Sequence, residues 1–108
     1  MFSALAIEKK ARRPRVLDVG SLTSYTNFLL IVTATSDRHS RALADYFIEV
    51  AKEHKVKSLG MEGYDPGQWI LLDFGDVIVH IFQETTREYY DLDGLWIDAT
   101  SVPIQETG

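Results

Sequence analysis

Residues 69–82, WILLDFGDVIVHIF, limit the fold of this chain more than any other segment. Two short apolar runs meet at Gly75-Asp76, which predicts an antiparallel hairpin closed by a two-residue loop. Side chains alternate between the two faces of a strand, so this register gives one face that is wholly apolar. The pairs on that face are Phe74 with Val77, Leu72 with Val79 and Ile70 with Ile81. Such a face has to lie against a hydrophobic core.

The opposite face of the same hairpin is also largely apolar. It pairs Trp69 with Phe82, Leu71 with His80 and Asp73 with Ile78. Sheets covered by helices on both faces read as nearly continuous hydrophobic runs, so covering helices explain this pattern. A partner protein that binds part of the face explains it as well. Both interpretations stay open from the hairpin alone.

The remaining segments predict a mixed sheet with helices packed on it. Ser36 or Asp37 is expected to cap the clearest helix, whose apolar residues recur at steps of three and four from Leu43 to His54. The other expected elements are a helix at 2–13, strands at 15–19, 27–34 and 58–62, one or two helical turns within 84–96, and a flexible tail at 99–108. This order predicts one α/β (α+β) domain over residues 1–108, with about five strands.

Composition excludes several classes of protein. The 108 residues include no cysteine, which excludes disulfides, thiol catalysis and Cys-ligated zinc. No apolar run approaches the roughly 20 residues that span a bilayer, and the N-terminus lacks a secretory signal pattern, so a cytoplasmic protein is expected. His39, His54 and His80 do not stand at metal-ligand spacings, and we expect neither a metal nor a cofactor.

One enzymatic interpretation has a basis in the sequence. Gly20-Ser21 between two strands is similar to the opening of the nucleotidyltransferase fold, in which two carboxylates on the next strand hold divalent ions. The next strand here begins Asn27-Phe28-Leu29 and contains no such pair of acids. The fold can persist without the activity, so the sequence predicts this topology without its catalytic carboxylates.

Charge is distributed unevenly along the chain. Residues 1–57 hold 10 Lys and Arg against 6 Asp and Glu, whereas residues 58–108 hold 1 against 10. The acidic second half favours a basic partner, because complementary potentials steer encounter. The basic run offers an auxiliary contact with ribosomal RNA phosphates, or else a solvated helix end. Its cations are Lys9, Lys10, Arg12, Arg13 and Arg15.

Taken together, the motifs resemble the Iojap family, the bacterial ribosomal silencing factors. The resemblance covers about residues 4–98 and rests on TNFLLIVTATS, SxRH, MEG, WILLDFGDVIVHIFQE and the R-x-x-Y-D-L-D-x-L-W series that ends at Trp96. It implies a non-enzymatic factor that binds the universal large-subunit ribosomal protein fourteen, blocks subunit joining when nutrients are short, and forms homodimers when free. The family usually has Asp where Asn27 stands here.

The resemblance and the two-sided hairpin together predict a partner-binding surface around Trp69. An apolar anchor with a charged rim is typical of interfaces in which a few aromatic residues supply most of the binding energy. The residues expected to contact the ribosomal protein are Glu62, Tyr64, Trp69, Asp73 and Asp76. A second group either contacts the partner or is structural, and it comprises His80, Arg87, Tyr90 and Trp96. In the structural interpretation, Arg87, Tyr90 and Trp96 fix the last helix to the sheet, and His80 is a hydrogen-bonded histidine beside Leu71.

Overall fold

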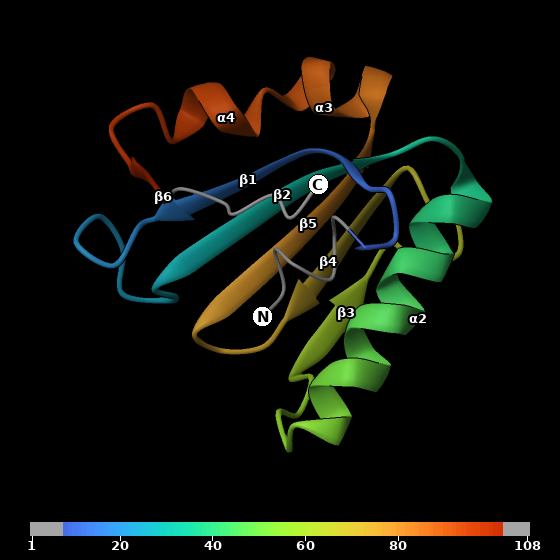
Figure 1. The fold of residues 1–108 in the computed structure, drawn as a ribbon. Helices are drawn as coiled ribbons and strands as arrows, with labels where there is room; N and C mark the ends of the chain where they lie inside the picture. The colour runs from blue at the N-terminus through green and yellow to red at the C-terminus, as the bar shows by residue number, and fades with distance from the viewer. Residues whose placement is uncertain (1–7, 103–108) are drawn as a thin grey trace.

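The structure is a computed structural model that describes residues 8–102. Its strands are β1 (Arg12–Asp18), β2 (Phe28–Ala34), β3 (Gly60–Glu62), β4 (Trp69–Asp73), β5 (Val77–Gln83) and β6 (Thr100–Val102), and its helices are α2 (Asp37–Glu53), α3 (Glu84–Tyr90) and α4 (Leu92–Leu95). Figure 1 shows one sheet between α2 on one side and α3 with α4 on the other. None of the helices within residues 8–102 is long and apolar enough to cross a membrane.

The six strands form one mixed sheet in the order β3-β4-β5-β2-β1-β6. Strands β2 and β5 are parallel, and the other neighbours are antiparallel. The predicted hairpin register is confirmed, from Trp69 opposite Phe82 to Asp73 opposite Ile78. Gly75 takes φ +86°, a conformation that favours glycine, and the Phe74 N–H donates to the Val77 carbonyl at 2.9 Å to close the turn.

Helix α2 covers the wholly apolar face of the hairpin. Its predicted cap is confirmed, since the Ser36 hydroxyl accepts a hydrogen bond from the His39 N–H at 3.0 Å. The helix and the sheet bury one hydrophobic cluster between them, and this cluster includes Leu30, Leu43, Ala44, Phe47, Ile70, Leu72 and Ile81. Burial at three- and four-residue steps along α2 therefore shows which side of the helix packs on the sheet.

The other face carries a second hydrophobic cluster beneath α3 and α4. It contains Leu17, Val19, Leu29, Ile31, Ile78 and Phe82, with Trp69, Leu71, Leu92, Trp96 and Ala99 packed against it. The two short helices are separated at Asp91, which takes φ +45° and whose carboxylate accepts from the Gly94 N–H at 3.1 Å. Helices thus cover this face over β5 and β2, as one of the two interpretations expected.

Two expectations about the ends of the chain need correction. Residues 100–102, expected in a flexible tail, form β6 instead, because they add to the free edge of β1 with Leu17 opposite Ser101. The sheet therefore has six strands rather than about five. Arg12 and Arg13, expected in a helix, belong to β1, where the register shifts between Arg12 and Arg15. The rest of that predicted helix falls mainly on residues 1–7, which lie outside the described residues, as does the end of the tail at 103–108.

Candidate partner-binding face

The face of the sheet opposite α2 is only partly covered by the chain itself. Helix α3 contacts β5 and β2, whereas β3 and β4 lie at the margin of the sheet. Leu71 and Asp73, which point to this face from β4, remain half-buried. Glu62 stands opposite Leu71 on β3 and is exposed. The β3–β4 margin is therefore the part of this face that a partner can reach.

Trp69 lies where the covered and open parts of the face meet. Its ring stacks on Phe82 at a centroid distance of 4.9 Å and tilts against Tyr90 at 4.7 Å. Its indole N–H donates to Nδ1 of His80 at 3.0 Å. The side chain is nevertheless only half-buried, so contacts on one side of the ring fix its orientation while another part stays open to solvent.

Gly63 allows the β3–β4 loop to pass close to Trp69. It takes φ +79°, and a Cβ at this position would lie 2.0 Å from the Trp69 carbonyl oxygen. A side chain would therefore displace either the loop or the start of β4. This contact explains the glycine of the MEG motif, because Gly63 lets the loop backbone lie beside Trp69.

His80 supports Trp69 from within the sheet. It is 7% exposed, and burial lowers its pKa from 6.5 to about 4. Because Nδ1 accepts the Trp69 N–H, the neutral ring carries its proton on Nε2. This histidine holds the ring of Trp69 in place, as expected for a hydrogen-bonded structural residue.

Arg87 fixes α3 and α4 to the sheet. Its side chain is 3% exposed, and Nε and Nη2 donate to the two carboxylate oxygens of Asp93 at 3.1 and 3.0 Å. Nη1 donates to the Arg13 carbonyl at 2.7 Å and to the Thr33 hydroxyl at 2.9 Å. Burial alone would raise the pKa of Asp93, but hydrogen bonds and charge from Arg87 and Arg15 lower it overall. Arg87 is therefore a structural residue in this fold.

The other two aromatic residues in the second group differ from each other. Trp96 packs against the second cluster and meets Tyr25 edge-on at 6.4 Å, so it helps to fix α4. Tyr90 contacts Trp69 and remains 54% exposed, so it belongs to the open surface. Its neighbour Tyr89 is 82% exposed and was missed by the sequence reasoning. The consecutive tyrosines were a usable signal, because adjacent helical residues cannot both face the sheet.

A polar groove of about 400 Å³ opens beside Tyr90. It is lined by Gln68, Gln83, Thr85, Thr86, Tyr89 and Tyr90. Amide and hydroxyl groups offer donors and acceptors for the backbone of a partner, and the two tyrosines offer ring faces. The groove therefore extends the surface around Trp69 along α3.

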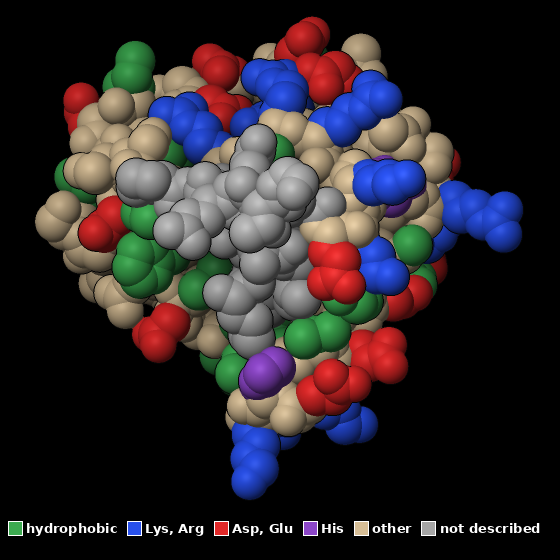
Figure 2. Space-filling model, viewed as in Figure 1, with side chains coloured by type: hydrophobic (Ala, Val, Ile, Leu, Met, Phe, Trp, Pro, Cys, Tyr) green, Lys and Arg blue, Asp and Glu red, His purple; other side chains and the backbone are tan. Residues whose placement is uncertain are grey.

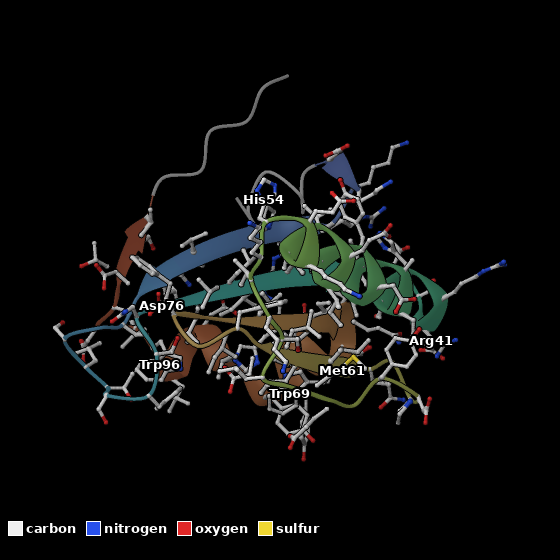
Figure 3. All side chains as sticks on the ribbon, turned by 90° about the horizontal axis from the view of Figure 1, so that it is seen from below. Arg41, His54, Met61, Trp69, Asp76 and Trp96 are labelled. Atoms are coloured by element: carbon white, nitrogen blue, oxygen red, sulfur yellow. The ribbon has the colours of Figure 1, made fainter. Side chains whose placement is uncertain are left out.

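The predicted acidic residues do not all gather around Trp69. Glu62 shares its face, but Asp76 lies in the turn of the hairpin, and Figure 3 shows Trp69 and Asp76 toward different ends of it. Asp73 accepts from the Gly75 N–H at 2.8 Å, which is ordinary turn chemistry. The Tyr64 hydroxyl donates to Asp45 of α2 at 2.9 Å, which raises the pKa of Tyr64 and places its side chain on the other side of the sheet.

Several cations of the basic run are engaged within the chain. Arg13 pairs with Glu84, and Arg15 pairs with Asp93 at 3.2 Å. The Lys9 ammonium lies 4.5 Å from the ring centre of Tyr46. Lys10 and Arg12 are exposed and form no ion pair with another residue of the described chain, so they are the members of the run best placed to reach an external anion.

The region similar to a nucleotidyltransferase site contains an amide instead of a carboxylate. Nδ2 of Asn27 donates to Asp76 at 3.1 Å, a bond that an aspartate at position 27 would be unable to donate. Over residues 8–102, His, Asp and Glu side chains nowhere form a group of three suited to a metal ion. The arrangement at Asn27 thus ties β2 to the hairpin turn.

Comparisons with known proteins agree on one family. The whole sequence, residues 1–108, matches the family described as "Ribosomal silencing factor during starvation". A "Ribosomal silencing factor RsfS" from Halalkalibacterium halodurans is 35% identical over 98 residues, which cover 91% of this chain and 84% of that protein. "Protein Iojap, chloroplastic" from Zea mays is 35% identical over 92% of this chain and 43% of its own length. A crystal structure of a Chromobacterium violaceum protein has a TM-score of 0.83 at 36% identity and covers 99% of this chain and 91% of that one.

Proposed function

Because this chain belongs to the family of ribosomal silencing factors, we propose that it binds the large ribosomal subunit and prevents the small subunit from joining it. The point of attachment is the universal large-subunit ribosomal protein fourteen. No chemical step is needed for this action. A domain with a Cα radius of gyration of 12.8 Å blocks the contact by occupying its space.

One observation supports this proposal above the others. Trp69 is held by Phe82, Tyr90 and His80, yet its side chain remains partly exposed at the uncovered margin of the sheet. An aromatic side chain that is fixed before binding loses little conformational freedom when a partner packs on it. Aromatic residues of this kind are enriched among the residues that dominate binding energy.

The charge of the surface fits a basic partner. Glu62 shares the face of Trp69, Asp73 and Asp76 follow toward the hairpin turn, and the second half of the chain has Arg87 as its one cation. Arg87 is buried, so it does not offset this acidic surface. Ribosomal proteins that contact RNA carry the opposite charge, which favours encounter with this face.

The test is co-sedimentation with purified large subunits, followed by addition of small subunits. The protein should enter the large-subunit fraction and reduce the yield of joined ribosomes. Trp69→Ala should weaken binding by about 30-fold or more, since truncating such an anchor costs about 2 kcal/mol or more. Tyr25→Ala, which removes another exposed tyrosine near α4, should bind as the unchanged protein does.

Trp69 also contributes to the fold, so the test needs a variant that leaves the core intact. Glu62→Lys with Tyr89→Ala changes two exposed side chains of the same surface. This double variant should keep its circular dichroism spectrum and lose most of its binding. A protein that never appears in the large-subunit fraction, or a double variant that binds at full strength, would refute the proposal.

The free protein is proposed to form a homodimer that uses the same open margin. Exposed aromatic surface around Trp69 and Tyr90 is then shared between a second copy and the ribosome. Sedimentation velocity across a dilution series measures this equilibrium. The alternative activity, transfer of nucleotides, has no pair of acids on β2 to hold magnesium, and an assay for magnesium-dependent transfer checks it directly.

A further inference from the structure

A second groove lies at the C-terminal end of α2, on the side of the sheet away from Trp69. It measures about 460 Å³ and is lined by Ile48, Lys52, Lys55, Val56, Lys57 and Ser58. Ile48 and Val56 are half-buried and pack against the core cluster under α2. The groove therefore has an apolar floor within a ring of ammonium groups.

The charged side chains that line this groove are all lysines. Among residues 8–102, ion pairs form at Arg13, Arg15 and Arg87, and none forms at Lys52, Lys55 or Lys57. Figure 2 shows cationic side chains projecting from the end of the molecule where α2 ends. On a protein of net charge −5, such a cluster selects for a negatively charged ligand.

An open strand edge adjoins the groove. Ser58 lines it, and two residues later the chain enters β3, which pairs with β4 on one side and ends the sheet on the other. All three residues of β3 are exposed. Leu59 is 67% and Met61 43% exposed, and Met61 stands opposite Leu72, so it points to the α2 side. An edge strand presents backbone N–H and C=O groups with which an added strand can pair.

We propose that this groove and the edge of β3 together bind an extended acidic segment of a partner protein. The segment adds to β3 as a further strand, places an apolar side chain over Ile48 and Val56, and sets its carboxylates against Lys52 and Lys57. Main-chain hydrogen bonds supply affinity, and the groove selects the side chains. The groove lies on the other side of the sheet from Trp69, so this binding shares with the ribosomal contact proposed above only the strand β3, where Glu62 stands on the Trp69 face.

A second copy of this chain is a poorer occupant than an acidic partner. Of the two strands that end the sheet, β3 offers one carboxylate, from Glu62, and β6, Thr100–Val102, offers none. Neither edge strand of the described sheet therefore supplies a segment with several carboxylates on one side. The three lysines that line the groove instead match an acidic sequence from another protein.

The test uses a synthetic peptide of alternating glutamate and valine with one central phenylalanine, titrated into ¹⁵N-labelled protein. Amide signals of residues 56–62 should shift, while the Trp69 indole signal should not. A peptide with glutamine in place of glutamate should bind at least about tenfold more weakly, and so should one N-methylated on alternate amides of its pairing edge.

Matched charge reversals separate this groove from general electrostatics. Lys52→Glu with Lys57→Glu should weaken peptide binding at least about tenfold, whereas Lys10→Glu with Arg12→Glu changes net charge equally and should leave it unchanged. Trp69→Ala should still bind the peptide whatever its effect on ribosome binding. The proposal would be overturned if the glutamine peptide bound as tightly as the glutamate peptide, or if both double variants lost binding equally. It would also be overturned if dimerisation of the protein alone shifted the amide signals of residues 56–62.

Discussion

Trp69 and His80 act as one unit at the scale of single residues. The indole N–H has its partner in Nδ1 of a buried imidazole, so the orientation of the tryptophan depends on the histidine remaining neutral. Protonation of Nδ1 would remove the acceptor and place a charge between Leu71 and Phe82. The aromatic surface therefore depends on a residue that never touches the partner.

This coupling predicts how stability varies with pH. The pKa of His80 is about 4 in the folded protein and 6.5 in the unfolded chain, so between these values the unfolded state binds more protons. The free energy of unfolding should fall as pH decreases from 6.5 to 4, by about 3 kcal/mol from this residue. Urea unfolding at pH 7, 6 and 5 measures the change.

His80→Asn isolates the contribution of the imidazole. Its side-chain oxygen can accept the Trp69 N–H without titrating, so the variant should lose less stability between pH 7 and 5 than the unchanged protein. His54→Asn, at an exposed histidine, should keep the full dependence. Identical slopes in the unchanged protein and in His80→Asn would show that His80 does not titrate in this way.

At the scale of elements, a single buried cation holds α3 and α4 against the sheet. Both helices are too short to be stable alone. Arg87 joins them to β1 and β2 through Asp93, the Arg13 carbonyl and Thr33. Because Tyr89 and Tyr90 lie on α3, this network also decides where the exposed aromatic residues stand.

Arg87→Met should therefore destabilise the domain by about 3 kcal/mol, since it leaves Asp93 and Thr33 without their buried donor. The methionine keeps much of the apolar stem, so lost volume is a small part of the effect. Glu84→Gln, which breaks the exposed pair with Arg13, should cost less than about 1 kcal/mol. Urea unfolding of the two variants compares them, and equal losses would contradict the assigned role of Arg87.

At the scale of the whole molecule, charge separates two sides of the sheet. The margin near Trp69 carries Glu62, whereas the end of α2 carries Lys52, Lys55 and Lys57. The two sides therefore suit partners of opposite charge. This arrangement follows from a chain whose cations, apart from the buried Arg87, all precede residue 58.

The effect of salt on ribosome binding should show which of these two sides contacts the ribosome. Association of the acidic margin with a basic ribosomal protein should slow as sodium chloride rises, because screening shortens the range of attraction. Glu62→Lys should reduce the association rate and flatten its salt dependence, whereas Lys52→Glu should leave both unchanged. Stopped-flow association with large subunits measures the rates, and equal effects of the two reversals would contradict this orientation.

Local pattern in the sequence was sufficient for much of the fold. The loop at Gly75-Asp76 gave the hairpin register residue by residue, because the length of a hairpin loop sets which residues of the two strands pair. Periodicity and the Ser36 cap located α2, and the sequence motifs were sufficient to indicate the family. These features depend on neighbours in the chain, which sequence displays directly.

Contacts between distant segments were decided by the tertiary structure alone. Residues 100–102 became a strand because the edge of β1 was free to pair, and Tyr64 turned toward Asp45 of α2 rather than joining Trp69. The partial exposure of Trp69 likewise depends on how far α3 reaches over β4, which is set by Arg87 and its partners on β1 and β2. Sequence specifies which side chains are apolar or charged, but only packing decides which of them remain uncovered, because burial depends on segments far apart in the chain.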